Sequence, residues 1–267
     1  QVTLFDAAAE VGGQFNLARR IPGKEEFGET LRYFRTRLKE LKVDVQLNRR
    51  VAAADLKGFD HVVVATGIVP RTPAIAGIDH PKVASYVDLL LGRKTAGKRV
   101  AVVGAGGIGF DVAEYLTHSD DHGDPVDAYR KTWGIDPAYT DKRGGLTEPQ
   151  MAPSPREVWL LQRKATKLGD GLAKTTGWAR RLLLQKRGVH MQGSVEYLKI
   201  DDAGLHIAVE GKERVLEVDT VVICAGQESQ RELVPGLEAA GIAHTLVGGA
   251  DVAAELDAKR AIWQATE

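Results

Sequence analysis

The chain has 267 residues, and its 36 lysine and arginine residues balance 36 aspartate and glutamate residues, so its formal net charge is zero. That balance argues against nucleic acid or an anionic membrane as the main partner. The longest apolar runs fall far short of the roughly 20 residues of a membrane helix, and the N-terminus carries no signal-peptide pattern, so we expect a cytoplasmic protein.

The first predicted strand covers residues 1–6 and ends in Asp6, and Gly12, Gly13 and Gln14 follow it. An acidic strand end suits the adenosine ribose of a dinucleotide, and neighbouring glycines let the backbone approach a ligand. We therefore expect these four residues to contact a cofactor, with a plain turn as the alternative. A strand that opens the chain, and a helical pattern that runs to its end, also predict that the chain is cut from a longer one and that a preceding strand and glycine loop are missing.

A helix is predicted at 25–41 and a strand at 61–65, which ends in Ala65 and runs into Thr66 and Gly67. A further strand at 99–103 is followed by the helix 108–117. Strands that are apolar on both faces and alternate with helices are typical of a parallel sheet covered by helices, so the pattern predicts a doubly wound α/β fold.

The turn after the strand at 99–103 has the pattern G-x-G-x-x-G, with glycines at 104, 106 and 109 and with Gly107 and Ile108 between the last two. In that pattern the first glycine makes a tight turn, the second lets the backbone approach a pyrophosphate, and the third packs the helix on the strand. The helix N-terminus offers N–H groups to the phosphates. Because a strand precedes the motif and a helix follows it, we expect Gly104, Gly106, Gly107, Ile108 and Gly109 to bind a dinucleotide.

Residues 118–155 are polar and weakly periodic, which predicts an excursion or a functional loop. Its residues His118, Asp120, Asp121 and His122 are better explained as solvated loop residues than as metal ligands. The next strand, 157–162, is followed by Arg163 and Lys164. Two cations at this strand tip suit a 2′-phosphate, so the cofactor is predicted to be NADPH, with an ordinary basic loop as the alternative.

Beyond a helix at 176–187, residues 195–218 read as three short antiparallel strands. The strand at 220–224 contains the chain's one cysteine, Cys224, and leads into Ala225 and Gly226, a glycine turn that we also assign to cofactor binding. A single cysteine excludes an intrachain disulfide or a cysteine-ligated cluster within this chain, and its apolar surroundings predict a buried thiol. Gly249 and Asp251 precede the last predicted helix, 252–264.

Taken together, the acidic strand end with Gly12-Gly13, Ala65-Thr66-Gly67, the motif at 104–109 and Gly249-Ala250-Asp251 resemble the two-dinucleotide flavoprotein family that includes glutathione and thioredoxin reductase. The resemblance implies an α/β protein with two Rossmann-like three-layer domains. An NADPH-binding domain, residues 96–226, would be inserted into an FAD-binding domain, residues 1–95 and 227–267, whose first strand is missing. It further implies that Asp251 bonds the ribityl chain of FAD and that the helix from Val252 points its N-terminus at the isoalloxazine, although one residue is inserted between Gly249 and Asp251.

A closer resemblance is to the C-terminal part of the bacterial NADPH-dependent 2,4-dienoyl-CoA reductases, carried by residues 11–15, 21–27, 67–73, 162–164 and 255–262. It implies that the chain passes hydride from NADPH to FAD. It also implies a partner absent from this chain, an N-terminal barrel domain with FMN and a four-iron cluster that reduces dienoyl-CoA in fatty acid oxidation. No residue here is expected to act as a catalytic acid or base. The alternatives are an ADP-binding domain of a trimethylamine- or histamine-dehydrogenase relative, and an inert nucleotide-binding fragment.

Overall fold

The computed structural model describes residues 1–119, 125–140, 143–254 and 258–267, and it divides into two compact units. The first unit combines Gln1–Arg71 with Gly226–Glu267, and the second is Thr72–Ala225. The second unit is therefore inserted into the first along the sequence. The sequence placed the first boundary at 95/96 instead. The difference arises because β5 (Val83–Ser85) hydrogen-bonds to β12 (Thr220–Ile223), which ties the segment before residue 96 to the second unit.

The second unit is built on a five-stranded parallel sheet in the order β5-β12-β6-β7-β8. The remaining strands are β6 (Arg99–Val103), β7 (Glu157–Leu161) and β8 (His190–Gln192). Four of the five residues of β6 are 0–1% exposed, because both faces of the sheet are covered. The parallel α/β architecture expected from the apolar runs is thus confirmed.

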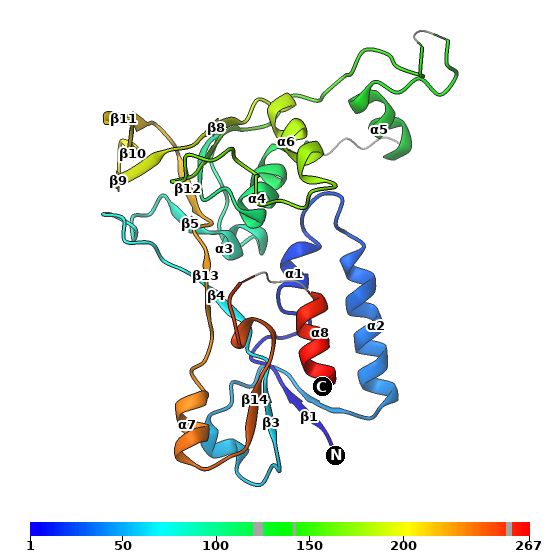
Figure 1. The fold of residues 1–267 in the computed structure, drawn as a ribbon, viewed down its shortest axis with the longest axis vertical. Helices are drawn as coiled ribbons and strands as arrows, with labels where there is room; N and C mark the ends of the chain where they lie inside the picture. The colour runs from blue at the N-terminus through cyan, green and yellow to red at the C-terminus, as the bar shows by residue number, and fades with distance from the viewer. Residues whose placement is uncertain (120–124, 141–142, 255–257) are drawn as a thin grey trace. The chain divides into compact units, whose positions relative to one another are not determined.

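Helices cover one face of this sheet: α3 (Tyr86–Leu90), α4 (Gly107–Thr117) and α6 (Gly177–Lys186) lie beside it in Figure 1. Helices α4 and α6 are joined by Arg180, which makes ion pairs with Asp111 and, at 3.1 Å, with Glu114. The second sheet, of β9 (Val195–Asp201), β10 (Gly204–Val209) and β11 (Lys212–Leu216), is the expected antiparallel meander. It packs on the other face, in one core cluster with alternate residues of the parallel strands, among them Ala101, Val103, Leu161, Val221 and Ile223.

The excursion at 118–155 is more structured than its composition predicts. It contains α5 (Pro125–Trp133) and an isolated bridge between Ile135 and Leu146. Proline is favoured in the first turn of a helix, and an Asp127–Arg130 ion pair at 3.3 Å spans one turn. Helix α5 lies beyond α6 and away from the sheet in Figure 1, so it does not cover a face of that sheet. Of the four residues weighed as metal ligands, those at 120–122 lie outside the described residues.

The first unit holds three two-stranded sheets among its described residues. Strand β1 (Thr3–Phe5) pairs in parallel with β2 (Asp44–Gln46), and β3 (Val62–Val64) pairs in parallel with β14 (His244–Leu246). Strand β4 (Ile68–Pro70) runs antiparallel to β13 (Gln227–Ser229). The other elements are α1 (Phe15–Ala18), α2 (Phe27–Glu40), α7 (Val234–Ala239), α8 (Ala258–Thr266) and the 3₁₀ turns η1 (Ala53–Leu56) and η2 (Gly248–Ala250).

The start of the last helix differs from the prediction. Helix α8 begins at Ala258, whereas residues 252–254 are not helical and 255–257 lie outside the described residues. The backbone carbonyl of Asp251 accepts from Arg231, and that of Val252 accepts from Arg260 at 2.6 Å. Guanidinium groups therefore take the acceptors that a helix from Val252 would need for its own N–H groups. Among the described helices, none has the length and apolar character to cross a membrane.

Candidate dinucleotide-binding sites

The turn between β6 and α4 admits only glycine at its first and third glycine positions. Gly104 has φ +112°, and a Cβ there would lie 2.7 Å from the carbonyl carbon of Cys224 and closer still to its oxygen. A Cβ on Gly109 would lie 2.9 Å from the carbonyl carbon of Gly104 and overlap its oxygen. The first glycine thus makes the turn against β12, and the third lets α4 pack directly on the turn, as the motif requires.

The middle of the same turn is open. A Cβ on Gly106 or on Gly107 would meet no heavy atom within 4 Å. Gly106 is the N-cap of α4, and Ile108 lies half-buried in the first turn of that helix. The first N–H groups of a helix have no partner within it and carry a partial positive charge. An exposed backbone cradle beside these donors fits the pyrophosphate of a dinucleotide.

The predicted basic tip lies beside this cradle. Strand β7 is the parallel neighbour of β6, and Gly104 N donates to Leu161 O, the last residue of β7, at 2.9 Å. Arg163 and Lys164 follow that residue and are both exposed. Their loop is held in place because Lys164 O accepts from Ser194 N at 3.1 Å and from the side chain of Gln162 at 3.0 Å. The structure therefore brings together the glycine turn and the two cations that the sequence assigned separately.

Sequence reasoning missed Tyr197, which lies on β9. Its hydroxyl is buried and has no hydrogen-bond partner in the part of the chain that the structure describes. Burial raises the pKa of this phenol, and the nearby charge of Arg163 opposes that shift. The backbone of Val195, two residues earlier, donates to Gln162 O at 3.0 Å, so Tyr197 lies close to the loop that follows β7. An unpartnered O–H here is a donor that a ligand at this edge could use. The one sequence signal for Tyr197 is its position in the predicted antiparallel strands, where an alternating pattern would turn its side chain toward the core.

Ala225 and Gly226 follow β12, on the other side of β6. Cys224 N donates to Val103 O at 2.8 Å, which holds the beginning of this turn against the end of β6. Gly226 has φ +101° and opens the second part of the first unit. Its carbonyl accepts from Arg71 N at 3.0 Å. Ala225 thus belongs to the same sheet edge as the glycine turn, whereas Gly226 belongs to the other unit.

In the first unit, Asp6 follows β1, and its Oδ1 accepts from Ala8 N at 2.8 Å. The glycine pair comes next: Gly12 has φ +141° and a Cβ there would lie 2.7 Å from the Asn16 amide, whereas Gly13 has φ +48° and open space around it. Gln14 is the N-cap of the short helix α1. Gly12 is therefore required for packing, and Gly13 leaves its backbone accessible to a ligand.

Two further predicted motifs meet in the first unit. A Cβ on Gly249 would lie 3.2 Å from the carbonyl carbon of Gly67, so the turn at 65–67 and the turn η2 are in direct contact. Ala65 and Thr66 are exposed, and the Thr66 hydroxyl donates to Gln230 O. Space around Gly67, which has φ +75°, is open.

The turn that carries Asp251 is fixed from three sides. Arg231 donates to Ala250 O at 2.7 Å. The side chain of Gln264 both donates to Asp251 Oδ2 and accepts from Gly248 N, each at 2.8 Å. An ordered carboxylate beside an open glycine turn is able to receive the hydroxyl groups of a ligand.

The family model of pyridine nucleotide-disulphide oxidoreductases matches residues 1–263 of the chain. The chain belongs to this family. A pyridine nucleotide-disulphide oxidoreductase is a flavin-dependent enzyme that binds FAD and a nicotinamide nucleotide, so the expectations of an oxidoreductase and of both kinds of cofactor are confirmed at the level of the family.

Relatives of this oxidoreductase are reductases of several substrates. The chain is 26% identical over 244 residues to the metal reductase of Desulforamulus reducens. The match covers 89% of this chain and 36% of the relative. It is 25% identical over 242 residues to the cinnamate reductase of Clostridium sporogenes. That match covers 87% of this chain and 30% of the relative. Both matches extend along most of this chain, but the chain spans only about a third of the length of each of these two curated relatives.

Solved structures share the fold. A 2-naphthoyl-CoA reductase in complex with 2-naphthoyl-CoA superposes with a TM-score of 0.77 at 23% identity, covering 98% of this chain and 34% of that one. Histamine dehydrogenase from Rhizobium sp. 4-9 gives a TM-score of 0.70 at 20% identity, and the superposition covers 96% of this chain and 38% of that one. At these identities the likeness establishes the Rossmann-like fold alone.

The residues of this oxidoreductase fit the cofactors of its family. The open cradle at Gly106, with the orphaned Tyr197 hydroxyl near the same edge, suits a dinucleotide in the second unit. The open backbone at Gly13 and Gly67 and the carboxylate of Asp251 suit FAD in the first. The disulphide in the family's name has no counterpart within this chain, because Cys224 is its one cysteine. Burial raises the pKa of that thiol. Among the described residues, no cluster of side chains could hold a metal ion.

Proposed function

We propose that the chain is the electron-input part of a flavin-dependent reductase, in which NADPH reduces FAD. The observation that carries the proposal is the contact between the glycine turn and the tip of β7, where Gly104 N donates to Leu161 O and the exposed Arg163 and Lys164 follow. A dinucleotide whose pyrophosphate lies at this turn places its adenosine ribose near the tip of the neighbouring strand. Two cations there favour the 2′-phosphate that distinguishes NADPH from NADH.

The roles of the chain's residues are to bind and to orient. Bound together, NADPH and FAD would supply the hydride transfer itself. The backbone at Gly106 and Gly107 and the N-terminus of α4 would hold the pyrophosphate of NADPH, and Ala225 would line the same edge. In the first unit, Asp6, Gly12, Gly13 and Gln14 would face the adenosine end of FAD. Ala65-Thr66-Gly67, Gly226, Gly249 and Asp251 would face its flavin end, with Asp251 bonding the ribityl chain.

For the complete enzyme we propose reduction of a 2,4-dienoyl-CoA, with electrons leaving FAD through an iron–sulfur cluster and FMN in a further domain of a cytoplasmic protein. The support is the resemblance at residues 11–15, 21–27 and 162–164, and the length of the relatives, about three times that of this chain. The single buried cysteine supports an acceptor outside this chain, because a dithiol within it is not available.

An amine-dehydrogenase relative is the second candidate, favoured by the fold likeness to histamine dehydrogenase. In such an enzyme this half would bind ADP and would not react with NADPH. ADP carries no 2′-phosphate, so the exposed cations Arg163 and Lys164 argue against the amine-dehydrogenase candidate.

The deciding experiment mixes the purified, flavin-loaded protein anaerobically with NADPH or with NADH and follows the loss of flavin absorbance. We expect NADPH to reduce it faster, and the variant Arg163→Ala/Lys164→Ala to lose at least about tenfold in affinity for NADPH and little for NADH. Lys212→Ala, an exposed lysine of β11, is the matched control. Reduction by neither nucleotide would support the amine-dehydrogenase candidate. Equal loss of both nucleotides in the double variant would overturn the assignment of the basic tip.

A further inference from the structure

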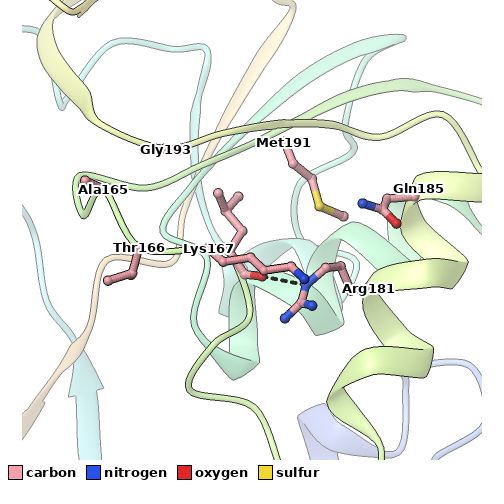
Figure 2. Close-up of a pocket in the computed structure, with 8 residues that line it drawn as sticks. Ala165, Thr166, Lys167, Arg181, Gln185, Met191 and Gly193 are labelled. Atoms are coloured by element: carbon pink, nitrogen blue, oxygen red, sulfur yellow. Dashed lines mark hydrogen bonds between the residues drawn. The ribbon is translucent and has the colours of Figure 1, made fainter.

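A pocket of about 260 Å³ lies in the second unit, between the loop after β7 and helix α6. Lys167 and Arg181 converge on it in Figure 2. Its lining starts at Ala165, directly after the basic tip, so the pocket belongs to the nucleotide end of the unit. The excursion at 118–155 lies outside that end, and the proposed function gives it no role.

The excursion is attached at the opposite edge of the parallel sheet. Helix α4 starts at the glycine turn and ends at Thr117, and β7 starts at Glu157, beside the first residue of β6. The residues that flank the excursion are held together, because the guanidinium of Arg156 donates to Leu116 O at 3.2 Å. The dinucleotide is expected where the strands end. The excursion is therefore an appendage with both attachments at the edge away from the dinucleotide.

The described part of the excursion has a defined backbone. Ile135 and Leu146 form an antiparallel bridge, beside which Asp136 N donates to Gly145 O at 2.9 Å. The carboxylate of Asp136 also accepts from Thr140 N at 2.6 Å. Two residues that face each other in such a bridge present their side chains on the same side. The backbone thus holds these side chains in place before any partner arrives.

This ordered backbone carries large apolar side chains on the outside. Tyr129 is 60% exposed, Ile135 38%, Tyr139 73% and Leu146 56%. The ring centroid of Tyr129 lies 6.3 Å from that of Trp133, one turn further along α5. We call these five side chains the excursion face. Apolar side chains gathered on an exposed surface mark a site of interaction.

Tyr139 is held in a conformation that its residue type rarely adopts. Its φ is +57°, in the left-handed region, where a bulky residue is uncommon and glycine or asparagine would be less strained. Its ring lies against Gly145, at which an added Cβ would be 3.0 Å from Tyr139 Cε1. Backbone strain persists mainly at functional positions. A turn that served only to reverse the chain would not require a tyrosine here.

The size of the excursion face indicates the kind of partner. An aromatic side chain offers about 150–250 Å², so two exposed tyrosines and three smaller or partly covered side chains present on the order of 400–500 Å². Separate molecules in a stable complex bury about 800 Å² on each side. Domains of one chain bury as little as about 300 Å² on each side, and their linkage keeps them at a high effective concentration. The face is thus too small for a second copy of the chain and large enough for a domain of the same polypeptide.

The length of the relatives is consistent with such a domain. The matched region is 36% of the metal reductase and 34% of the 2-naphthoyl-CoA reductase chain, so about two thirds of each lies outside it. We propose that the excursion face docks the further domain of the complete enzyme, through apolar contacts and through carbonyl groups that accept from the tyrosine hydroxyls. The proposal rests on the proposed function, which includes that domain.

The test measures how fast a thiol reagent reaches position 139. Cys224 is buried and is the chain's one cysteine, so Tyr139→Cys adds an exposed thiol, and mass spectrometry of its peptide follows the reaction. We expect labelling to be at least about tenfold slower in the complete enzyme than in this chain alone, because docking leaves less than about a tenth of the molecules open. Lys212→Cys, at an exposed position of β11, is the matched control and should react equally in both. Leu146→Cys gives the same measurement if Tyr139→Cys does not fold.

A second substitution tests whether the face itself holds the domain. Leu146→Asp, combined with Tyr139→Cys in the complete enzyme, should restore the labelling rate of the chain alone, because a carboxylate is costly in an apolar contact. Leu146 is exposed, so Leu146→Asp should leave the unfolding curve of the chain alone unchanged.

The outcomes separate docking from hydride transfer. Equal labelling of position 139 in the chain alone and in the complete enzyme would overturn the docking proposal, and so would protection that Leu146→Asp leaves unchanged or that Lys212→Cys shares. Labelling of the chain alone that slows as its concentration rises would place a second copy on the face and would also overturn it. Reduction of FAD by NADPH is measured on this chain without the further domain. A positive result there together with unprotected labelling would leave the proposed hydride transfer standing and the docking wrong.

Discussion

Gly104→Ala tests whether the glycine turn is built as the structure has it. At φ +112°, an alanine would occupy a backbone conformation that L-residues rarely adopt, at a cost of about 1–3 kcal/mol. Its Cβ would lie 2.7 Å from the carbonyl carbon of Cys224 and 3.2 Å from Ala225 N. Because these neighbours are backbone atoms of the turn that follows β12, relief requires that turn to move, at about 1–3 kcal/mol more. The sum, about 2–6 kcal/mol, is a large part of the stability of a typical domain.

The assay is urea unfolding followed by circular dichroism and tryptophan fluorescence, with titration of NADPH on the folded protein. Gly107→Ala is the matched control, since Gly107 is the first residue of α4 and its Cβ would meet no atom within 4 Å. We expect the control to change the free energy of unfolding by less than about 0.5 kcal/mol. Gly106→Ala should be as stable as the control but bind NADPH more weakly, because its methyl group would enter the open cradle.

A different pattern would refute the reasoning. If Gly104→Ala is as stable as Gly107→Ala, the turn does not press against Cys224 as described. If Gly106→Ala binds NADPH unchanged, the open space at that glycine is not where the pyrophosphate lies.

Three further predictions concern charges and the thiol. Arg180→Met should lower the free energy of unfolding in urea by about 3 kcal/mol, because it removes the guanidinium that pairs with Asp111 and Glu114, two carboxylates of α4 that are only 16–18% exposed. No loss of stability would contradict the bridge between α4 and α6. Hydrogen bonds from Lys199 and then His206 hold the pKa of Asp201 well below its usual range, so its stabilisation is complete above about pH 4 and is lost as the pH falls through the depressed pKa. Asp201→Asn should therefore be less stable than the unchanged protein at pH 7, with a gap that closes in acid unfolding curves below about pH 4; a gap independent of pH would count against this. Because burial raises the pKa of Cys224, the folded protein should resist a thiol reagent at pH 8 and react fully only in denaturant, and rapid labelling of the folded protein would contradict its burial.

The parts of the fold that depend on local sequence could be predicted. The strand 99–103, the glycines that follow it and the helix that starts there are neighbours in sequence, and their spacing alone determines the turn. The proximity of Arg163 to that turn could also be predicted, because consecutive parallel strands end at the same edge of a sheet. Predicted strands with apolar residues on both faces were sufficient to indicate a parallel sheet that is covered on both sides.

The features that sequence reasoning missed depend on contacts between distant residues. Residues 252–254 are not helical, and distant guanidinium groups, those of Arg231 and Arg260, bind the backbone carbonyls of Asp251 and Val252. The unit boundary moves because β5 pairs with β12, and that pairing has no local signal. Lys167 and Arg181 are on separate elements, and only the fold shows that they line one pocket.

The two connections between the units have a consequence for how such a protein is assembled. The chain leaves the first unit after β4 and returns through β13, and these strands are an antiparallel pair with Arg71 N bonded to Gly226 O at 3.0 Å. The ends of the inserted segment are thus already adjacent, as the ends of a hairpin loop are. A short glycine linker from Arg71 to Gly226 should close the first unit, and Thr72–Ala225 could be expressed by itself, so that each half of the redox pair becomes a separable part.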